Sequence, residues 1–193
     1  MGHTQMAQHI GALGPNTQLN AACASGSQAI AIATDWIAAG RCKRVLVISA
    51  DDVVYKKNLE WIGSGFLASG AATTSGVVED AAVPFGKSRN GMILGSGAAA
   101  FVVEAGGLCA ERGLRPLSRV VATHIGNSAF HATRLEPNTI REAFKRVTDA
   151  VSNYSGLSRS ELARELVFMS HETYTPARGG SSAAEVDALR HAF

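Results

Sequence analysis

The sequence is poor in charge, in aromatic side chains and in cysteine. Charged residues make up 18% of the 193 residues, aromatic residues 6%, and the formal net charge is +2. Because no block of basic residues stands out, the electrostatic case for a nucleic-acid partner is weak. The three cysteines, Cys23, Cys42 and Cys109, have no CxxC spacing. This count argues against a disulfide framework or a zinc site and favours a reducing, cytoplasmic setting.

Long hydrophobic runs are also missing. No apolar run approaches the ~18 residues of a membrane span, so we expect no membrane partner. The first residues, MGHTQMAQHIG, lack the basic start and apolar centre of a secretory signal. What the chain does contain is 46% hydrophobic residues and 20 glycines. That composition is enough for one large domain or a piece of a larger one, with a sizeable core.

Strand-like and helix-like patterns alternate along the chain. Apolar runs and helical spacing predict strands over 17–20, 45–50, 97–103, 117–123 and 166–170, and helices over 5–13, 25–39, 108–112 and from Pro137 or Asn138 to Gly156. Two Ser-x-x-Glu capping boxes, Ser158 with Glu161 and Ser182 with Glu185, predict two more helices. Residues 61–80 carry no clear pattern. The alternation predicts an α/β fold with a mostly parallel sheet and helices on both faces.

Two side chains fall where chemistry collects in such folds, at the carboxyl ends of predicted strands. Cys23 directly precedes the predicted helix 25–39, whose N-terminus favours the thiolate. The small residues around it permit a sharp turn and the close approach of an acyl group. His171 follows the predicted strand 166–170. A lone cysteine among alanines is also typical of a small core residue, and a lone histidine is more often structural, so both readings stay open.

Three stretches resemble motifs of one enzyme family, the β-ketoacyl synthases of fatty acid and polyketide synthesis. NAACASGSQAIAIATDWIAAGRCKRVLVISADDV resembles the active-site stretch, with Cys23 at the acylated cysteine. VPFGKSRNGMILGSGAAAFVVE resembles the pattern PFDxxRDGFVxGEGAGxxVLE. HETYTPARGGSSAAEVDAL resembles HGTGTxxGDxxE, with correspondence at His171, Thr173, Thr175 and Glu185. The order and separations agree, and the stretches together span nearly the whole chain.

The sequence also departs from these motifs. Glu172 and Tyr174 stand where the third motif has glycines, and Gly86 and Ser96 replace acidic residues of the second. Since glycine lets backbone come close to a ligand, we expect Glu172 and Tyr174 to narrow or reshape the channel for the substrate's pantetheine arm. The departures are typical of a divergent branch, closer to multi-domain polyketide or polyunsaturated-fatty-acid synthases.

The resemblance implies a thiolase-like fold of two similar α/β halves, of which this chain is an incomplete, central part. Residues 1–105 correspond to the remainder of the first half with the nucleophile. Residues 106–193 correspond to the start of the second half with the first histidine. The family's second histidine is expected beyond Phe193, so we expect the chain alone to lack full activity.

The resemblance further implies a decarboxylative condensation. Cys23 would take an acyl group from an acyl carrier protein, and a neutral His171 would stabilise charge on a malonyl thioester. Thr173 and Thr175 would hydrogen-bond the pantetheine arm. No metal or redox cofactor is expected, because the substrates are carried on phosphopantetheine of the carrier protein or on coenzyme A. A homodimer or a complementing chain is implied as a further partner.

Two alternatives stay open. The chain is either part of a non-elongating or scaffold homologue that binds carrier protein, or part of a thiolase-like acyltransferase that uses coenzyme A thioesters. The retained Cys23 argues against the scaffold, whereas Glu172 and Tyr174 argue mildly for it. The PFxxxRxG stretch favours condensing enzymes of the carrier-protein type.

Overall fold

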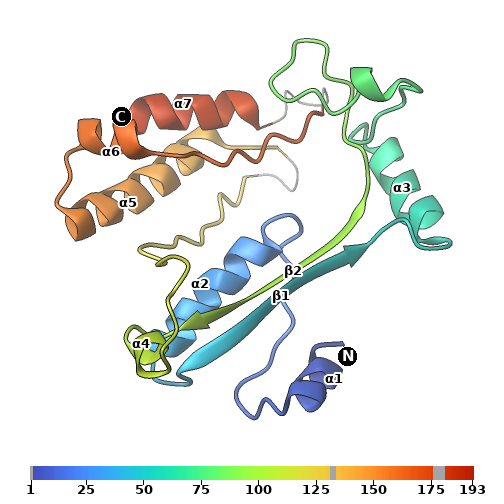
Figure 1. Cartoon of the computed structure of the whole chain (residues 1–193). Helices are drawn as coiled ribbons and strands as arrows, with labels where there is room; N and C mark the ends of the chain where they lie inside the picture. The colour runs from blue at the N-terminus through green and yellow to red at the C-terminus, as the bar shows by residue number, and fades with distance from the viewer. Residues whose placement is uncertain (1, 131–133, 176–180) are drawn as a thin grey trace. The chain divides into compact units, whose positions relative to one another are not determined.

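The computed structural model describes residues 2–130, 134–175 and 181–193. Its elements are α1 (Gly2–Ile10), α2 (Ser25–Ala38), β1 (Arg44–Asp52), α3 (Asn58–Ala68), the 3-10 turn η1 (Val78–Asp80), β2 (Ser96–Glu104), α4 (Leu108–Glu111), α5 (Pro137–Ser155), α6 (Arg159–Glu165) and α7 (Ser182–Ala192) (Figure 1). The chain divides into two compact units, residues 1–50 with 98–125 and residues 51–97 with 126–193. Among the described residues, none of the helices has the length and apolarity needed to span a membrane.

The strands β1 and β2 form a two-stranded antiparallel ribbon (Figure 1). At one end the amide of Ala105 donates to the carbonyl of Lys43 at 3.0 Å. At the other end the Ser96 hydroxyl donates to Asp52 at 2.8 Å. The pairing therefore runs in opposite directions along the two strands, as the order of these contacts requires.

Two of the five strand predictions are confirmed, and the other three predicted strands do not appear in the described part of the chain. The runs 45–50 and 97–103 lie inside β1 and β2, but 117–123 and 166–170 pair with no strand, and near 17–20 only an isolated bridge forms. A strand exists only where its backbone finds a ladder partner, whereas the sequence pattern reports only apolar spacing. The predicted parallel pairing is therefore not what β1 and β2 show.

Helix α2 confirms the prediction for 25–39 and ends as expected. Its buried residues are Ala31 and Ala33. Gly40 follows the helix with φ of +69°, the left-handed conformation that glycine adopts without strain. At the other end, a Cβ at Gly26 would lie 3.0 Å from the Ser49 hydroxyl, so the first turn of α2 lies directly against β1.

Helices α5 and α7 lie side by side in the second unit (Figure 1). Arg141 on α5 forms a two-pronged ion pair with Asp187 on α7. The ring of Phe144, also on α5, lies 5.5 Å from that of Phe168, centroid to centroid. The predicted helix ends are confirmed, since Pro137 begins α5, Gly156 ends it at φ of +73°, and the Ser158 capping box begins α6.

Helix α3 overlaps the stretch 61–80, in which the sequence shows no clear pattern. It contains Gly63 and Gly65, and glycine weakens a helical pattern because it costs about 1 kcal/mol relative to alanine. Gly63 is nevertheless buried, with the side chains of Leu59 and Leu94 each 3.8 Å from its missing Cβ. Close packing at a small residue, rather than propensity, thus accounts for this helix.

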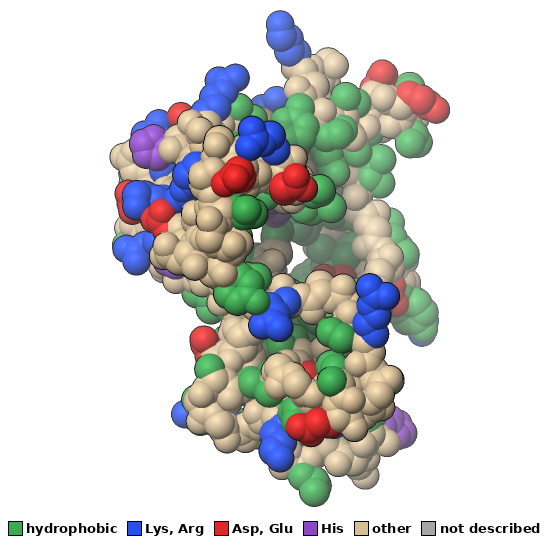
Figure 2. Space-filling view, turned by 60° about the vertical axis from the view of Figure 1, so that its left-hand side comes forward, with side chains coloured by type: hydrophobic (Ala, Val, Ile, Leu, Met, Phe, Trp, Pro, Cys, Tyr) green, Lys and Arg blue, Asp and Glu red, His purple; other side chains and the backbone are tan. Residues whose placement is uncertain are grey.

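The described structure leaves much apolar surface uncovered. Its accessible area is 13675 Å². A folded monomer of this mass would expose about 8,700 Å², and two separate domains of half the mass would expose about 10,500 Å² in total. Large side chains such as Leu117, Val167 and Met169 are almost wholly exposed, and hydrophobic side chains are spread over the face seen in Figure 2. The chain thus presents surface of the kind that other polypeptide covers.

Gly91 provides a test of the backbone in the second unit. Its φ is +112°, its amide donates to the carbonyl of Tyr174 at 2.9 Å, and a Cβ would lie 2.7 Å from the backbone of Ala72 and Thr73. We expect Gly91→Ala to lower the free energy of unfolding by more than about 1 kcal/mol, measured by urea titration.

The matched control is Gly65→Ala, in α3 of the same unit, where nothing lies within 4 Å of the added Cβ. There the change should be neutral or stabilise the helix by up to about 1 kcal/mol. Equal effects at the two positions would contradict the assigned conformation of Gly91.

The hydrogen bonds of Glu136 at the start of α5 lead us to expect that stability depends on pH. Its carboxylate accepts hydrogen bonds from the Thr139 amide at 2.6 Å, the Thr139 hydroxyl at 2.9 Å and the Asn138 amide at 3.1 Å, which lower the pKa of this carboxyl. A lowered folded-state pKa stabilises the fold above the ordinary glutamate value of about 4.3, and this contribution is lost as the pH falls through the lowered pKa.

We therefore expect Glu136→Gln to flatten part of the fall in melting temperature between about pH 5 and about pH 2. Thermal unfolding followed by circular dichroism across this range measures the slope. An identical slope in the wild type and the variant would show that the cap does not titrate with folding.

Candidate active site

Cys23 lies in a tight turn directly before α2. The preceding residue, Ala22, has φ of +48°, a left-handed conformation that is uncommon for alanine. The Ser25 hydroxyl holds this turn, because it accepts from the amide of Ala21 at 2.9 Å and donates to the carbonyl of Ala22 at 2.7 Å. The Asn20 side chain also accepts from the amide of Ala22, at 3.2 Å. The sequence therefore places the strain beside the cysteine and supplies the groups that stabilise it.

The thiol of Cys23 is exposed and takes part in no disulfide. In the described structure Cys23 is therefore not a core residue. The residue in the N-cap position of α2 is Ala24, which offers no side-chain acceptor to the first amides of the helix. The first amides of α2 therefore have no side-chain cap, and they are open to polar groups that approach the turn.

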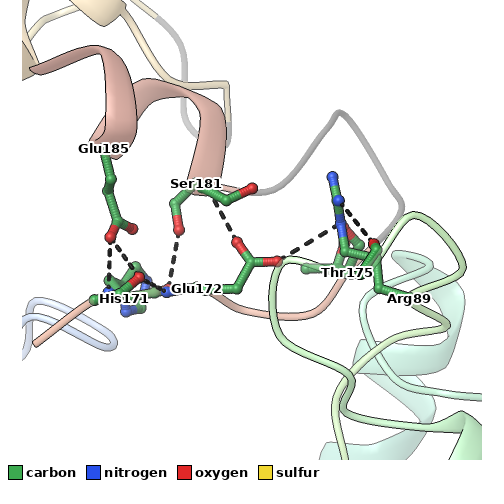
Figure 3. A network of polar contacts seen from close by, with 9 residues as sticks. Arg89, His171, Glu172, Thr175, Ser181 and Glu185 are labelled. Carbon is green, nitrogen blue, oxygen red and sulfur yellow. Dashed lines mark hydrogen bonds and ion pairs between the residues drawn. The ribbon is translucent and has the colours of Figure 1, made fainter. Parts of the chain in front are cut away.

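His171 has its backbone clamped on both sides (Figure 3). Its amide donates to Glu185 Oε2 at 3.1 Å, and its carbonyl accepts from the Ser181 hydroxyl at 3.0 Å. The hydroxyl of Ser170 donates to the same Glu185 oxygen at 2.5 Å. The residue itself is exposed. The backbone is therefore fixed by α7, while the imidazole remains accessible.

The predicted capping box of Ser182 with Glu185 is wrong. Ser181 is in the N-cap position of α7, its side chain makes no cap hydrogen bond, and Ser182 is the first residue of the helix. Glu185 is buried, and a buried carboxylate requires donors. Its Oε2 finds them in Ser170 and His171, so the side chain acts across the site rather than at the end of its own helix, while Oε1 has no hydrogen-bond partner among the described residues.

Glu172 is a second buried carboxylate beside His171. Its residue is 7% exposed, and its Oε2 accepts from the amide of Ser182 at 3.0 Å. Its Oε1 lies 3.6 Å from Arg89 Nε. Arg89 Nε also donates to the carbonyl of Thr175 at 3.2 Å, and its Nη1 donates to the carbonyl of Gly86 at 3.3 Å. Figure 3 shows Arg89 reaching both Glu172 and Thr175.

The remaining residues of the motif lie in the same loop. Thr173 and Thr175 are half-buried, and Tyr174 adopts φ of +58° with its carbonyl bound to the amide of Gly91. That Thr173 and Thr175 bind a pantetheine arm stays a prediction. Residues 176–180 of the third motif lie outside the described residues.

Cys23 belongs to the first unit, whereas His171, Thr173 and Thr175 belong to the second. His171, Glu172 and the two threonines share one segment, which Arg89 and Glu185 contact from two other parts of the second unit. It describes the cysteine within its own unit, so the approach of thiol and imidazole stays a prediction. In the described residues, no three His, Cys, Asp or Glu side chains are arranged to hold a metal ion.

Sequence reasoning missed the partners of Glu172 and Glu185. In the sequence, Glu172 stands out only because it replaces a glycine of the third motif, and Arg89 lies within the second motif. The available signal was an acidic residue within a run of small and hydroxyl residues, since a carboxylate placed there requires a cation or several donors. No local rule states that the cation comes from 83 positions earlier in the chain.

Comparison with known proteins identifies the chain's relatives. The family model described as "Beta-ketoacyl synthase, N-terminal domain" matches residues 1–106, more than half of the chain. The chain is 26% identical over 193 residues to 3-oxoacyl-[acyl-carrier-protein] synthase 2 of Staphylococcus aureus, covering all of this chain and 45% of that protein. It is 31% identical over 147 residues to the tetracenomycin polyketide synthase ketoacyl synthase alpha subunit of Streptomyces glaucescens, covering 76% of this chain and 34% of that one.

A solved structure shows the same fold. A type II polyketide ketosynthase, in complex with its acyl-carrier protein and bound to a hexaketide, aligns with a TM-score of 0.76 at 23% identity, over 97% of this chain and 44% of that chain. The chain thus spans less than half the length of these relatives. Its fold is thiolase-like, and the named relatives are condensing acyltransferases, which does not favour the scaffold or thiolase alternatives. The chain belongs to the β-ketoacyl synthase family.

Proposed function

We propose that this chain is the ketosynthase segment that carries the acyl-accepting cysteine and the first histidine of a carrier-protein-dependent condensing enzyme. The observation that carries the proposal is the exposed Cys23 thiol, held in a strained turn at the N-terminus of α2. A nucleophile must be accessible and rigidly placed, and an exposed residue beside a turn held by Ser25 and Asn20 supports both conditions. The activity of the whole protein, its substrates and its partners are part of this proposal.

In the first step, the Cys23 thiolate attacks the carbonyl carbon of an acyl thioester. The Cys23 sulfur–carbon bond forms, the carbon–sulfur bond to pantetheine breaks, and the released thiolate takes a proton. The positive end of α2, which begins at Ser25, attracts the negative charge of the attacking sulfur. A backbone amide near the turn is suited to the oxyanion that forms on the carbonyl oxygen.

In the second step, a malonyl thioester loses carbon dioxide, and its α-carbon attacks the acyl group on Cys23. The new carbon–carbon bond forms as the bond to the cysteine sulfur breaks, which returns the thiolate and releases a β-ketoacyl thioester. Negative charge develops on the malonyl thioester oxygen during decarboxylation. The neutral imidazole of His171 donates a hydrogen bond to that oxygen, and Thr173 and Thr175 bind the pantetheine arm. The chemistry uses no metal or redox cofactor.

The proposed partners are an acyl carrier protein and further polypeptide that covers the exposed apolar surface. One solved relative is a complex of a ketosynthase with its carrier protein, which supports the first partner. The accessible area, far above that of a folded monomer of this mass, supports the second, either as a homodimer or as a complementing chain. We retain the division near residue 106 and the cytoplasmic location as predictions.

Acylation of Cys23 tests the proposal directly. We expect incubation with an acyl-pantetheine thioester to add one acyl group to the chain, because the first step needs only the nucleophile and its turn. Cys23→Ala should abolish the adduct. Intact-mass spectrometry with peptide mapping measures it, and a wild-type chain without any adduct would sink the proposal.

Cys109 serves as the matched control thiol in the same unit. It donates to Glu104 at 3.3 Å, and this hydrogen bond to a carboxylate, with burial, raises the pKa of the Cys109 thiol. Less of it is thiolate at a given pH, so acylation at Cys109 should be slower than at Cys23. Cys109→Ala should keep the adduct. Equal labelling of both thiols would indicate unspecific chemistry.

A further inference from the structure

We infer that Glu172 is a positioning residue for His171 and that it acts as one charge pair with Arg89. The inference rests on the proposed function only in the role that it gives to His171. It concerns a residue at which this chain departs from the family motif, so the motif itself does not supply it. The argument depends on contacts inside the second unit alone.

The first step is the burial of the carboxylate. The Glu172 side chain is 2% exposed and that of Arg89 is 19% exposed. A carboxylate removed from water to this extent is stable only when charge or hydrogen bonds compensate for the lost hydration. Glu172 Oε2 has the Ser182 amide, and Oε1 has no hydrogen-bond donor but faces Arg89 Nε at 3.6 Å. The guanidinium is therefore the main compensation for Oε1.

The second step is what the pair connects. Arg89 lies in the stretch PFGKSRNG and also binds the carbonyl of Thr175. Two residues later, the amide of Gly91 binds the carbonyl of Tyr174. That stretch thus contacts the segment 171–175 at Glu172, Tyr174 and Thr175, all on the C-terminal side of the histidine.

The third step is the position of His171 between two anchors. On one side, Glu185 and Ser181 of the α7 region hold the amide and the carbonyl of His171. On the other side, Glu172 holds the first residue of α7 through the Ser182 amide and holds Arg89 through charge. Loss of the charge on Glu172 leaves the first anchor intact and frees the second. The imidazole would then sample more orientations while the fold persists.

The fourth step is the comparison with glycine. A glycine at position 172 has no side chain, so its motif depends on backbone conformation alone. Here a glutamate takes that position and couples the backbone of the histidine segment to a cation from another motif. The orientation of His171 therefore depends on Arg89 in this chain.

The experiment follows the His171 ring by two-dimensional NMR of the chain labelled on histidine. His191 on α7 of the same unit is the internal reference, and His171→Asn assigns the signal. We expect Glu172→Gln and Arg89→Gln each to shift and broaden the His171 ring signal and leave that of His191 in place. The shift of the His171 signal in the double variant should be no larger than in the more affected single variant. Each single change already removes the same Glu172–Arg89 interaction.

Amide hydrogen exchange in the same samples gives the magnitude. We expect the Gly91 amide to exchange about 10- to 100-fold faster in Glu172→Gln, because loss of the ion pair weakens the contact between the Arg89 stretch and the segment 171–175. Amides of α2, in the other unit, should keep their rates. Glu165→Gln at the end of α6 is the control for removal of an exposed negative charge, and it should change neither readout.

Arg89→Lys keeps the inference testable if Glu172→Gln does not fold. It preserves the positive charge, so the His171 signal should remain close to that of the wild type, whereas Arg89→Gln should move it. Equal displacement by both variants, or an unmoved His171 signal in Glu172→Gln, would overturn the inference. A signal that moves together with His191 would also overturn it, as global destabilisation. No readout requires acyl transfer, so a failure of Cys23 to accept an acyl group is seen separately.

Discussion

The second unit depends on one constraint, which is that a buried carboxylate must find donors. Glu172 and Glu185 are both buried within a few residues of the candidate histidine. The Oε2 atoms accept hydrogen bonds from the histidine segment itself and from the start of α7, and Arg89 faces Glu172 Oε1 as an ion pair. Because these partners lie far apart along the chain, satisfying two side chains fixes three segments at once. Electrostatic need, rather than a large apolar core, organises this part of the molecule.

The cysteine turn follows a related principle on a smaller scale. Ala22 adopts a strained conformation, and the hydrogen bonds of Ser25 and Asn20 stabilise it. In both places the residue expected to do chemistry is exposed, while its neighbours carry the constraint. Such an arrangement keeps the reactive group accessible and restricts its conformational freedom. Efficient chemistry usually requires both.

The sequence predicted local features well and long-range ones poorly. Helices α2 and α5, with their terminal glycines, and the capping box of α6 follow from spacing and end signals, which act over a few residues. The strand predictions at 117–123 and 166–170 are wrong because strand pairing depends on a partner that the periodicity of the sequence does not reveal. Glu185 was misassigned for a related reason, since its local pattern is that of a capping box but burial turns its carboxylate toward His171. Cys23 and His171 follow from their places after predicted strands and from the motifs, but those two strands do not form in the described chain, and the geometry around both residues required the fold.

The ribbon of β1 and β2 has a practical consequence. Each strand pairs along one side only in the described part of the chain, and Leu46, Ile48, Phe101 and Val102 on these strands are exposed. Open edges with apolar side chains are templates for adding further strands. During recombinant expression the same ribbon therefore favours intermolecular β-pairing and precipitation, and co-expression with the complementing polypeptide proposed above is the rational route to soluble material.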